Sequence, residues 1–291
     1  MGQLLCLYWK ETVSLNGVRY DVIKSVGEGA FSFVQLVKRG SDSYALKRVL
    51  IQVPEHKEMI NREIKAHQSI KHSHVMPLVD YEIVQNSNGS EARLLFPYHK
   101  LGSVQEIIEV SKITKKPIPE VEILSIFKSL CSAVHAFHSH DPPMAHRDIK
   151  PHNLLIAENS TAILMDLGSC REAVVRINSR QEALALQELA AQDCTAAFRA
   201  PELFEVPSEC IINEKTDIWS LGCTLYALAY GDSPCDGTAL SAVSPKIKTD
   251  DTRYSDHFNK LIVNILKNDP VERPSALEII EMINEINNEQ K

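Results

Sequence analysis

The sequence predicts an α+β fold with two lobes, a small β-rich amino-terminal lobe containing one helix and a larger, mainly helical carboxy-terminal lobe. Two observations predict this architecture. Residues 20–98 mostly alternate apolar and polar side chains with the period of two that is typical of strands. Beyond Gly102 the apolar period lengthens to 3.6, as in amphipathic helices. At 291 residues, 44% hydrophobic and 24% charged, the chain has ordinary globular composition.

Charge and cysteine content exclude several classes of protein. A net charge of −7 argues against nucleic acid as the main partner, because such partners demand a basic surface. The seven cysteines are widely spaced, with no pair at metal-binding spacing, which indicates reduced thiols inside the cell. No apolar run approaches the roughly 20 residues that a membrane-spanning helix needs.

Residues 1–19 form a predicted head that precedes the folded domain. Gly2 is the residue that N-myristoylation requires, and Cys6 stands where the usual pattern has Ser or Thr. One acyl chain binds membranes with a constant of only about 10⁴ M⁻¹, so stable anchoring needs a second signal. Lys10 and Arg19 are too few cations to provide it, and we therefore expect palmitate on Cys6. The alternative is a free amino terminus on a soluble protein.

The first predicted strands, residues 20–26 and 33–37, flank a turn that contains Gly27 and Gly29. Glycines in such a turn let backbone N–H groups approach an anion closely. Ser32 stands where the usual glycine-rich pattern has a third glycine.

The next strand, residues 44–49, contains Lys47, and a helical stretch follows from about 55 to 70. A buried lysine needs a counter-charge, and this helix offers several acids. Spacing alone leaves both Glu58 and Glu63 open as the partner.

Further strands are predicted at residues 76–84 and 93–98, and helices at 104–110 and 119–139. The link between the helical stretch that ends near residue 70 and the strand at 76–84 contains His72 and His74. Two alternating histidines without a nearby third ligand indicate a structural connection rather than a zinc site.

The most informative motif is His-Arg-Asp-Ile-Lys-Pro-His-Asn at residues 146–153, followed by Asp166-Leu167-Gly168. Phosphoryl transfer requires a base for the hydroxyl proton, oxygen ligands for Mg²⁺ and a cation near the moving charge. Asp148 is the candidate base, Asn153 and Asp166 are candidate Mg²⁺ ligands, and Lys150 is the candidate cation. Short strands at 154–156 and 162–165 are predicted to direct these groups toward one another.

This spacing resembles the protein-kinase signature. The resemblance implies a two-lobed protein-kinase fold over about residues 20–286, with the lobes at 20–98 and 99–286. It implies ATP as the phosphate donor, with Mg²⁺ or Mn²⁺, and selects Glu63 as the partner of Lys47. The nucleotide contacts that it implies are Gly27, Gly29, Val34, Ala45, Lys47, Glu63, Phe96, Pro97, His99 and Leu155. Phe96 would lie behind the adenine, and the Pro97 carbonyl and His99 amide would pair with it.

The segment after Asp166 contains an unusual helix signal. Ser179 and Glu182 form a capping box that opens an apolar stripe of Leu186, Leu189 and Ala190. An extra helix in the activation segment is a feature of the Numb-associated kinases, and the chain is identified as a member, most similar to the member that carries myristate and palmitate. Because packing of this helix can replace ordering by a phosphate, we expect activity without upstream phosphorylation.

Four positions beyond this helix complete the resemblance. Thr195 stands where serine/threonine kinases have a hydroxyl that bridges the catalytic acid, Asp148, and Lys150. Asp217 opens a strongly apolar helix to residue 230 and is expected to accept backbone N–H bonds from the catalytic loop. Glu202 and Arg273 resemble the family's buried ion pair. Residues 231–252 are predicted to be loop-rich.

The sequence leaves three classes of function to weigh: an active protein kinase, a pseudokinase-like scaffold at membranes and a small-molecule phosphotransferase. Lys47, Asp148, Lys150, Asn153 and Asp166 are all present, which favours the active enzyme. Ala200-Pro201-Glu202 and the link before it favour protein substrates. The resemblance implies the cytoplasmic side of Golgi-proximal membranes, with a cytosolic pool, and the sequence leaves the oligomeric state open.

Overall fold

The computed structural model describes residues 11–28, 32–86, 89–158, 160–248 and 252–289. The predicted lipid sites Gly2 and Cys6, and Gly29 of the glycine turn, lie outside these ranges. The chain divides into two compact units, residues 1–68 with 76–100, and residues 69–75 with 101–291. The first is β-rich with one helix and the second is mainly helical, which confirms the predicted α+β fold class.

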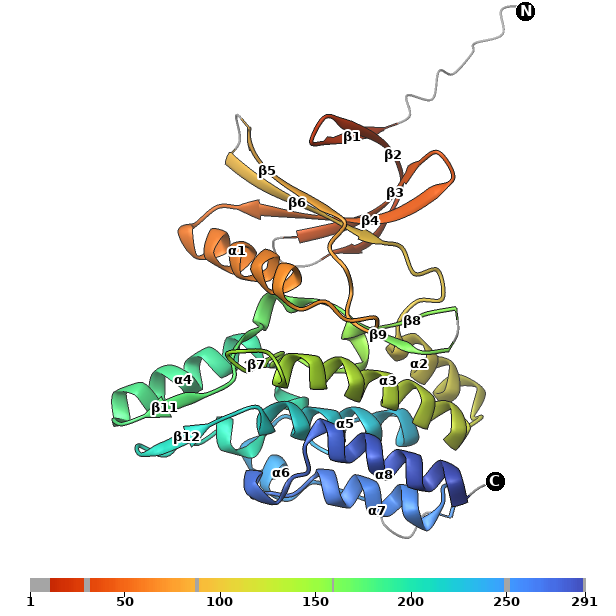
Figure 1. Ribbon diagram of the computed structural model, residues 1–291, viewed down its shortest axis with the longest axis vertical. Coiled ribbons are helices and arrows are strands. Elements are labelled where there is room, and N and C mark those ends of the chain that lie inside the picture. The colour runs from red at the N-terminus through yellow and green to blue at the C-terminus, as the bar shows by residue number, and fades with distance from the viewer. Residues whose placement is uncertain (1–10, 29–31, 87–88, 159, 249–251, 290–291) are drawn as a thin grey trace, which may run out of the picture. The chain divides into compact units, whose positions relative to one another are not determined.

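In the described residues the first unit is an antiparallel sheet of six strands with one helix, α1 (Pro54–Ser69) (Figure 1). The order across the sheet is β1-β2-β3-β4-β6-β5. The strands are β1 (Thr12–Leu15), β2 (Val18–Glu28), β3 (Ser32–Arg39), β4 (Asp42–Ile51), β5 (Asp80–Asn86) and β6 (Gly89–Pro97). Residues 76–79, predicted as part of a strand, precede β5 as an irregular segment.

Strand β1 lies in the stretch that was predicted as a head before the domain. It pairs with β2, and the turn after it reaches the opposite edge of the sheet, where the Asn16 side-chain amide donates to Asp80 Oδ1 at 2.9 Å and to the Tyr81 carbonyl at 3.1 Å. The two edge strands therefore meet around a core that includes Leu15 and Leu46. The described part of this unit therefore includes β1, ahead of the predicted boundary at residue 20, because four residues are too few for a period of two to show in the sequence.

The second unit contains seven described α-helices and three short strand pairs (Figure 1). The helices are α2 (Val104–Thr114), α3 (Glu120–His138), α4 (Arg180–Asp193), α5 (Lys215–Tyr230), α6 (Ala239–Val243), α7 (Asp256–Ile265) and α8 (Ala276–Glu289). The strand pairs are β7 (Met144–Ala145) with β10 (Arg171–Glu172), β8 (Leu154–Ile156) with β9 (Ala162–Leu164), and β11 (Val175–Ile177) with β12 (Cys210–Ile212). The short α6 lies in the segment predicted to be loop-rich.

Helix α5 forms the centre of the second unit, with α3 and α7 packed against it. Its residues 216–229 are all buried, in agreement with the predicted apolar helix. Gly222 allows the close approach of α7, because a Cβ at this position would lie 2.7 Å from Leu266 Cδ2. None of the described helices is long and apolar enough to cross a membrane.

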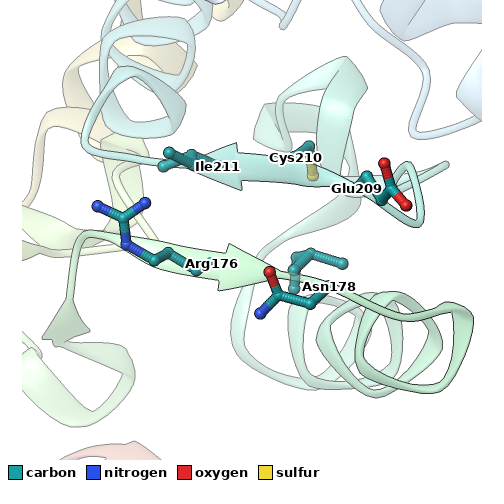
Figure 2. Close-up of a pocket in the computed structure, with 6 residues that line it drawn as sticks. Arg176, Asn178, Glu209, Cys210 and Ile211 are labelled. Carbon is teal, nitrogen blue, oxygen red and sulfur yellow. The ribbon is translucent and has the colours of Figure 1, made fainter.

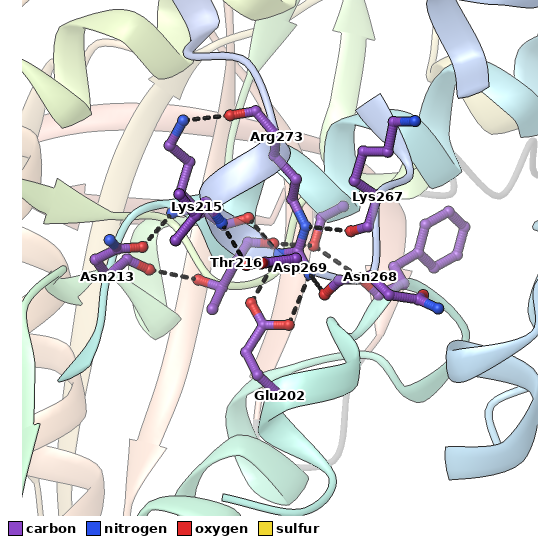
Figure 3. A network of polar contacts seen from close by, with 11 residues as sticks. Glu202, Asn213, Lys215, Thr216, Lys267, Asn268, Asp269 and Arg273 are labelled. Carbon is purple, nitrogen blue, oxygen red and sulfur yellow. Dashed lines mark hydrogen bonds and ion pairs between the residues drawn. The ribbon is translucent and has the colours of Figure 1, made fainter. Parts of the chain in front are cut away.

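The predicted ion pair between Glu202 and Arg273 is present, with Arg273 buried and Glu202 partly buried (Figure 3). Nη1 and Nη2 of Arg273 donate to the two Glu202 oxygens at 2.7 and 2.8 Å. The same two nitrogens also donate to the carbonyls of Lys215 and Asn268, and Nε donates to the carbonyl of Lys267. Arg273 is 1% exposed, and its guanidinium lies 5.1 Å from the ring of Trp219. The pair thus joins three segments that are far apart in the sequence.

Candidate active site

In the first unit, Lys47 is paired with Glu63. Lys47 Nζ lies 2.7 Å from Glu63 Oε1, and Glu63 is only 1% exposed, whereas Glu58 on the same helix is exposed. Of the two acids that spacing left open, Glu63 is therefore the counter-charge. The bond runs from β4 to α1 and orients the lysine amine on the face of the sheet that α1 covers.

The other nucleotide-contact residues predicted in this unit gather around Lys47. Val34 pairs with Lys47 and Ala45 pairs with Phe96 across neighbouring strands, so these four side chains share one face of the sheet. Gly27 pairs with Val34, and a Cβ at Gly27 would meet nothing closer than 3.8 Å.

The residues predicted to pair with adenine lie near the carboxy-terminal end of this unit. Pro97 is the last residue of β6, and His99 follows it, half-buried. Burial lowers the pKa of His99, so its imidazole favours the neutral form. Leu155, the remaining predicted contact, belongs to the second unit, where it lies half-buried in β8 beside Ser103.

In the second unit, four donors converge on the carboxylate of Asp148. One oxygen accepts from the Thr195 hydroxyl at 2.6 Å and from the Thr195 N–H at 3.1 Å. The other accepts from Lys150 Nζ at 2.8 Å and from the Asn153 amide at 3.0 Å. Lys150 Nζ also donates to the Thr195 hydroxyl at 2.6 Å, so this hydroxyl bridges the acid and the lysine.

The loop that carries Asp148 is fastened to α5 by Asp217. The backbone N–H groups of His146 and Arg147 donate to the Asp217 carboxylate at 2.7 and 2.8 Å, and His138 Nε2 lies 3.2 Å from it. Burial is the largest single influence on the pKa of Asp217 and would raise it. The hydrogen bond and charge of His138, with His146 and the Arg147 N–H, outweigh burial and lower this pKa. The ionised carboxylate therefore holds the loop.

The two candidate Mg²⁺ ligands are brought together by the pairing of β8 with β9. Asn153 precedes β8, Asp166 follows β9 closely, and the Met165 N–H donates to the Asn153 carbonyl at 2.9 Å. Among the described residues, the Asn153 side chain makes two hydrogen bonds, both through its amide nitrogen, and its amide oxygen is the candidate ligand atom. An amide oxygen and a carboxylate are oxygen donors of the kind that Mg²⁺ prefers, so the residues fit this ion.

The activation segment contains the predicted helix, α4, with two corrections. The Ser179 hydroxyl accepts the Glu182 N–H at 3.2 Å, but the Glu182 carboxylate accepts the Asn178 N–H at 2.7 Å rather than the Ser179 N–H. The cap is therefore only half of a capping box. The buried stripe is Ala183, Leu186 and Ala190, and Leu189 is only partly buried.

The carboxy-terminal end of α4 is held by contacts that sequence reasoning missed. Arg171 Nε lies 2.8 Å from Asp193 Oδ2, and the Ser169 hydroxyl donates to the Asp193 carbonyl at 2.9 Å. An isolated acid at the end of a helix and an arginine 22 positions earlier give no periodic signal.

An open pocket of about 330 Å³ lies beside the β11–β12 pair (Figure 2). Arg176 and Ile211 extend from the two facing strands, and Glu209 and Asn178 lie at the other end of the pair. None of the residues predicted for catalysis lines this pocket.

Comparison with known proteins agrees with this geometry. Residues 20–283 match the family model described as protein kinase domain. A probable serine/threonine-protein kinase of Dictyostelium discoideum is 36% identical, over 97% of this chain and 98% of its own. Serine/threonine-protein kinase 16 of Homo sapiens and that of Rattus norvegicus are each 37% identical, over 94% of this chain and 92% of their own.

Proposed function

The chain belongs to the protein kinase family, and from this premise we propose that it is a membrane-associated serine/threonine kinase whose activation segment is ordered without phosphorylation. Its class of reaction is ATP-dependent phosphorylation of serine or threonine in proteins. The capped helix α4 in the activation segment supports membership of the Numb-associated kinases.

In the proposed mechanism, Asp148 receives the proton of the acceptor hydroxyl as that oxygen attacks the γ-phosphorus of ATP, and the bond from this phosphorus to the β–γ bridging oxygen breaks to release ADP. Thr195 and Asn153 hold the carboxylate in one orientation, because each donates a hydrogen bond to a different oxygen. Lys150 supplies positive charge beside the same carboxylate. Lys47, oriented by Glu63, contacts the ATP phosphates. Asn153 and Asp166 would hold Mg²⁺, which when bound neutralises charge on the phosphates.

The proposal that the enzyme is active without phosphorylation of its activation segment rests on the ion pair between Arg171 and Asp193. A phosphate on an activation segment acts by pairing with arginine and ordering the chain. Here the Asp193 carboxylate provides a permanent negative charge at the end of α4, bonded to an arginine just after the Asp166-Leu167-Gly168 turn. The buried face of α4 and the bond from Gln187 Nε2 to the Phe204 carbonyl, 2.9 Å, support the same order.

We expect Asp193→Asn to lower kcat/KM for a protein substrate about tenfold, because a hydrogen bond to a charged group contributes roughly 1.5–3 kcal/mol. Initial rates of phosphate transfer from enzyme without bound phosphate measure this. Glu188→Gln, which removes an exposed charge from the same helix, is the matched control and should act like the parent. An Asp193→Asn enzyme as active as the Glu188→Gln enzyme would show that the ion pair does not order the segment.

The proposal of membrane association rests on the amino-terminal pattern, with Gly2 as the myristate site and Cys6 as the palmitate site. Golgi-proximal membranes, with a cytosolic pool, are the location implied by the resemblance. One chain alone gives weak and reversible binding, so both sites should contribute.

In cells, Gly2→Ala should move the protein from the membrane fraction to the soluble fraction, and Cys6→Ser should leave it divided between the two. Fractionation and immunoblotting measure this. Lys10→Ala, which removes a nearby cation, is the control for electrostatic binding and should leave the distribution unchanged. Unaltered membrane partitioning of Gly2→Ala would contradict the proposal.

A further inference from the structure

A row of four charged side chains and one aromatic ring crosses the sheet of the first unit on the face opposite to Lys47. The strand register pairs Glu28 with Phe33, Phe33 with Arg48, Arg48 with Arg93, and Arg93 with Glu82. Neighbours in register point to the same face, so these side chains form one continuous row over five strands. The same face also includes the apolar core around Leu46.

Within the row, the guanidinium of Arg48 forms hydrogen bonds with a buried carboxylate. Arg48 Nη2 donates to Glu91 Oε2 at 3.1 Å and Arg48 Nε donates to Glu91 Oε1, while Arg93 Nε contacts the same carboxylate at 3.3 Å. Glu91 is only 4% exposed. Burial is the largest influence and would raise the pKa of Glu91, but the two arginines together outweigh it and lower this pKa. An ionised Glu91 therefore fixes the guanidinium of Arg48.

The guanidinium of Arg48 in turn lies over an aromatic ring. Its central carbon is 4.7 Å from the centroid of Phe33, a cation–π distance. Phe33 immediately precedes Val34, whose side chain points to the Lys47 face and which pairs with Gly27. Because successive residues of a strand point to opposite faces, holding the Phe33 ring also holds Val34 and its pairing with Gly27.

We propose that Arg48, fixed by Glu91, is a positioning residue for nucleotide binding, which clamps Phe33 on one face of the sheet and thereby sets Val34 and Gly27 on the other. This inference rests on the kinase activity of the chain, and it assigns Arg48 no contact with ATP. Loss of the clamp lowers the fraction of molecules with a competent nucleotide surface. The apparent affinity falls by the same factor, while the chemical step of the bound enzyme is unchanged.

The test compares the KM for ATP of Phe33→Leu and Phe33→Tyr enzymes. Phe33→Leu removes the aromatic face and should raise this KM about 2- to 30-fold, the range that corresponds to a cation–π contact, with kcat unchanged. Phe33→Tyr keeps the face and should restore the parent KM. Arg48→Met should match Phe33→Leu, and ATP should raise the unfolding temperature less in both than in the parent.

Arg93→Met provides the matched control, because Arg93 shares Glu91 and donates to the Ser14 carbonyl at 2.9 Å but is not the residue stacked on Phe33. It should lower the unfolding temperature and leave the KM for ATP unchanged. Three outcomes would overturn the proposal: a parent-like KM in Phe33→Leu, failure of Phe33→Tyr to restore it, or an equal rise in Arg93→Met. The last would indicate a general effect of sheet stability.

Discussion

Replacing Asp148 with asparagine is expected to lower kcat about 10²–10⁴-fold, the contribution that a positioned general base typically makes. Asparagine keeps the size of the side chain but cannot take the proton of the acceptor hydroxyl. It also places an amide where four donors now converge, so at least one of Thr195, Lys150 and Asn153 loses its acceptor. The KM for ATP should change little, because the mechanism assigns Asp148 itself no contact with the nucleotide.

Steady-state kinetics with a generic protein substrate measure this effect. Asp42→Asn, the same change at the exposed first residue of β4, is the control. Thr195→Ser retains the bridging hydroxyl and should be close to the parent, whereas Thr195→Val should lose most of its activity. An Asp148→Asn enzyme within tenfold of the parent kcat would remove Asp148 from the role of base.

The second large effect concerns stability: Arg273→Met should lower the free energy of unfolding by roughly 3–5 kcal/mol. The change leaves Glu202, whose side chain is only 13% exposed, without its partner and leaves the carbonyls of Lys215, Lys267 and Asn268 without that donor. For a domain of this size the unfolding temperature should fall by about 6–20 °C. Thermal and urea unfolding measure it.

Two controls separate the buried charge from the lost packing. The double variant Glu202→Leu with Arg273→Met should be more stable than Arg273→Met alone, because no unpaired charge remains. Lys112→Met breaks an ion pair with Asp232 whose two side chains are exposed, and it should change the unfolding temperature little. A drop for Lys112→Met as large as that for Arg273→Met would contradict the argument from burial.

The elements that could be predicted from sequence are those with a local signal. The strands around Lys47, the capped helix α4 and the apolar helix α5 all follow from periodicity or from capping residues. The catalytic cluster was equally accessible, because Asp148, Lys150 and Asn153 lie within one short loop. The convergence of Lys150, Asn153 and Thr195 on the Asp148 carboxylate could be predicted from a known motif.

Features that depend on contacts between distant segments could not be predicted. Spacing left Glu58 and Glu63 equivalent, and only the direction of α1 against β4 separates them. The pairing of Arg171 with Asp193 depends on where α4 ends. Arg48 carried a weak signal, since it is a polar residue on a strand face that is otherwise apolar, but its partner Glu91 lies two strands later in the sequence.

The most direct test of the account is the initial rate of Mg²⁺-dependent phosphate transfer from ATP to serine or threonine of a generic protein. The enzyme should be one whose intact mass shows no bound phosphate. The account predicts the full rate from the first time point without a lag, and its loss in an Asp166→Asn enzyme prepared in the same way. Transfer that begins only after the enzyme has been phosphorylated would contradict the self-ordered activation segment, and no transfer under either condition would indicate a scaffold instead of an enzyme.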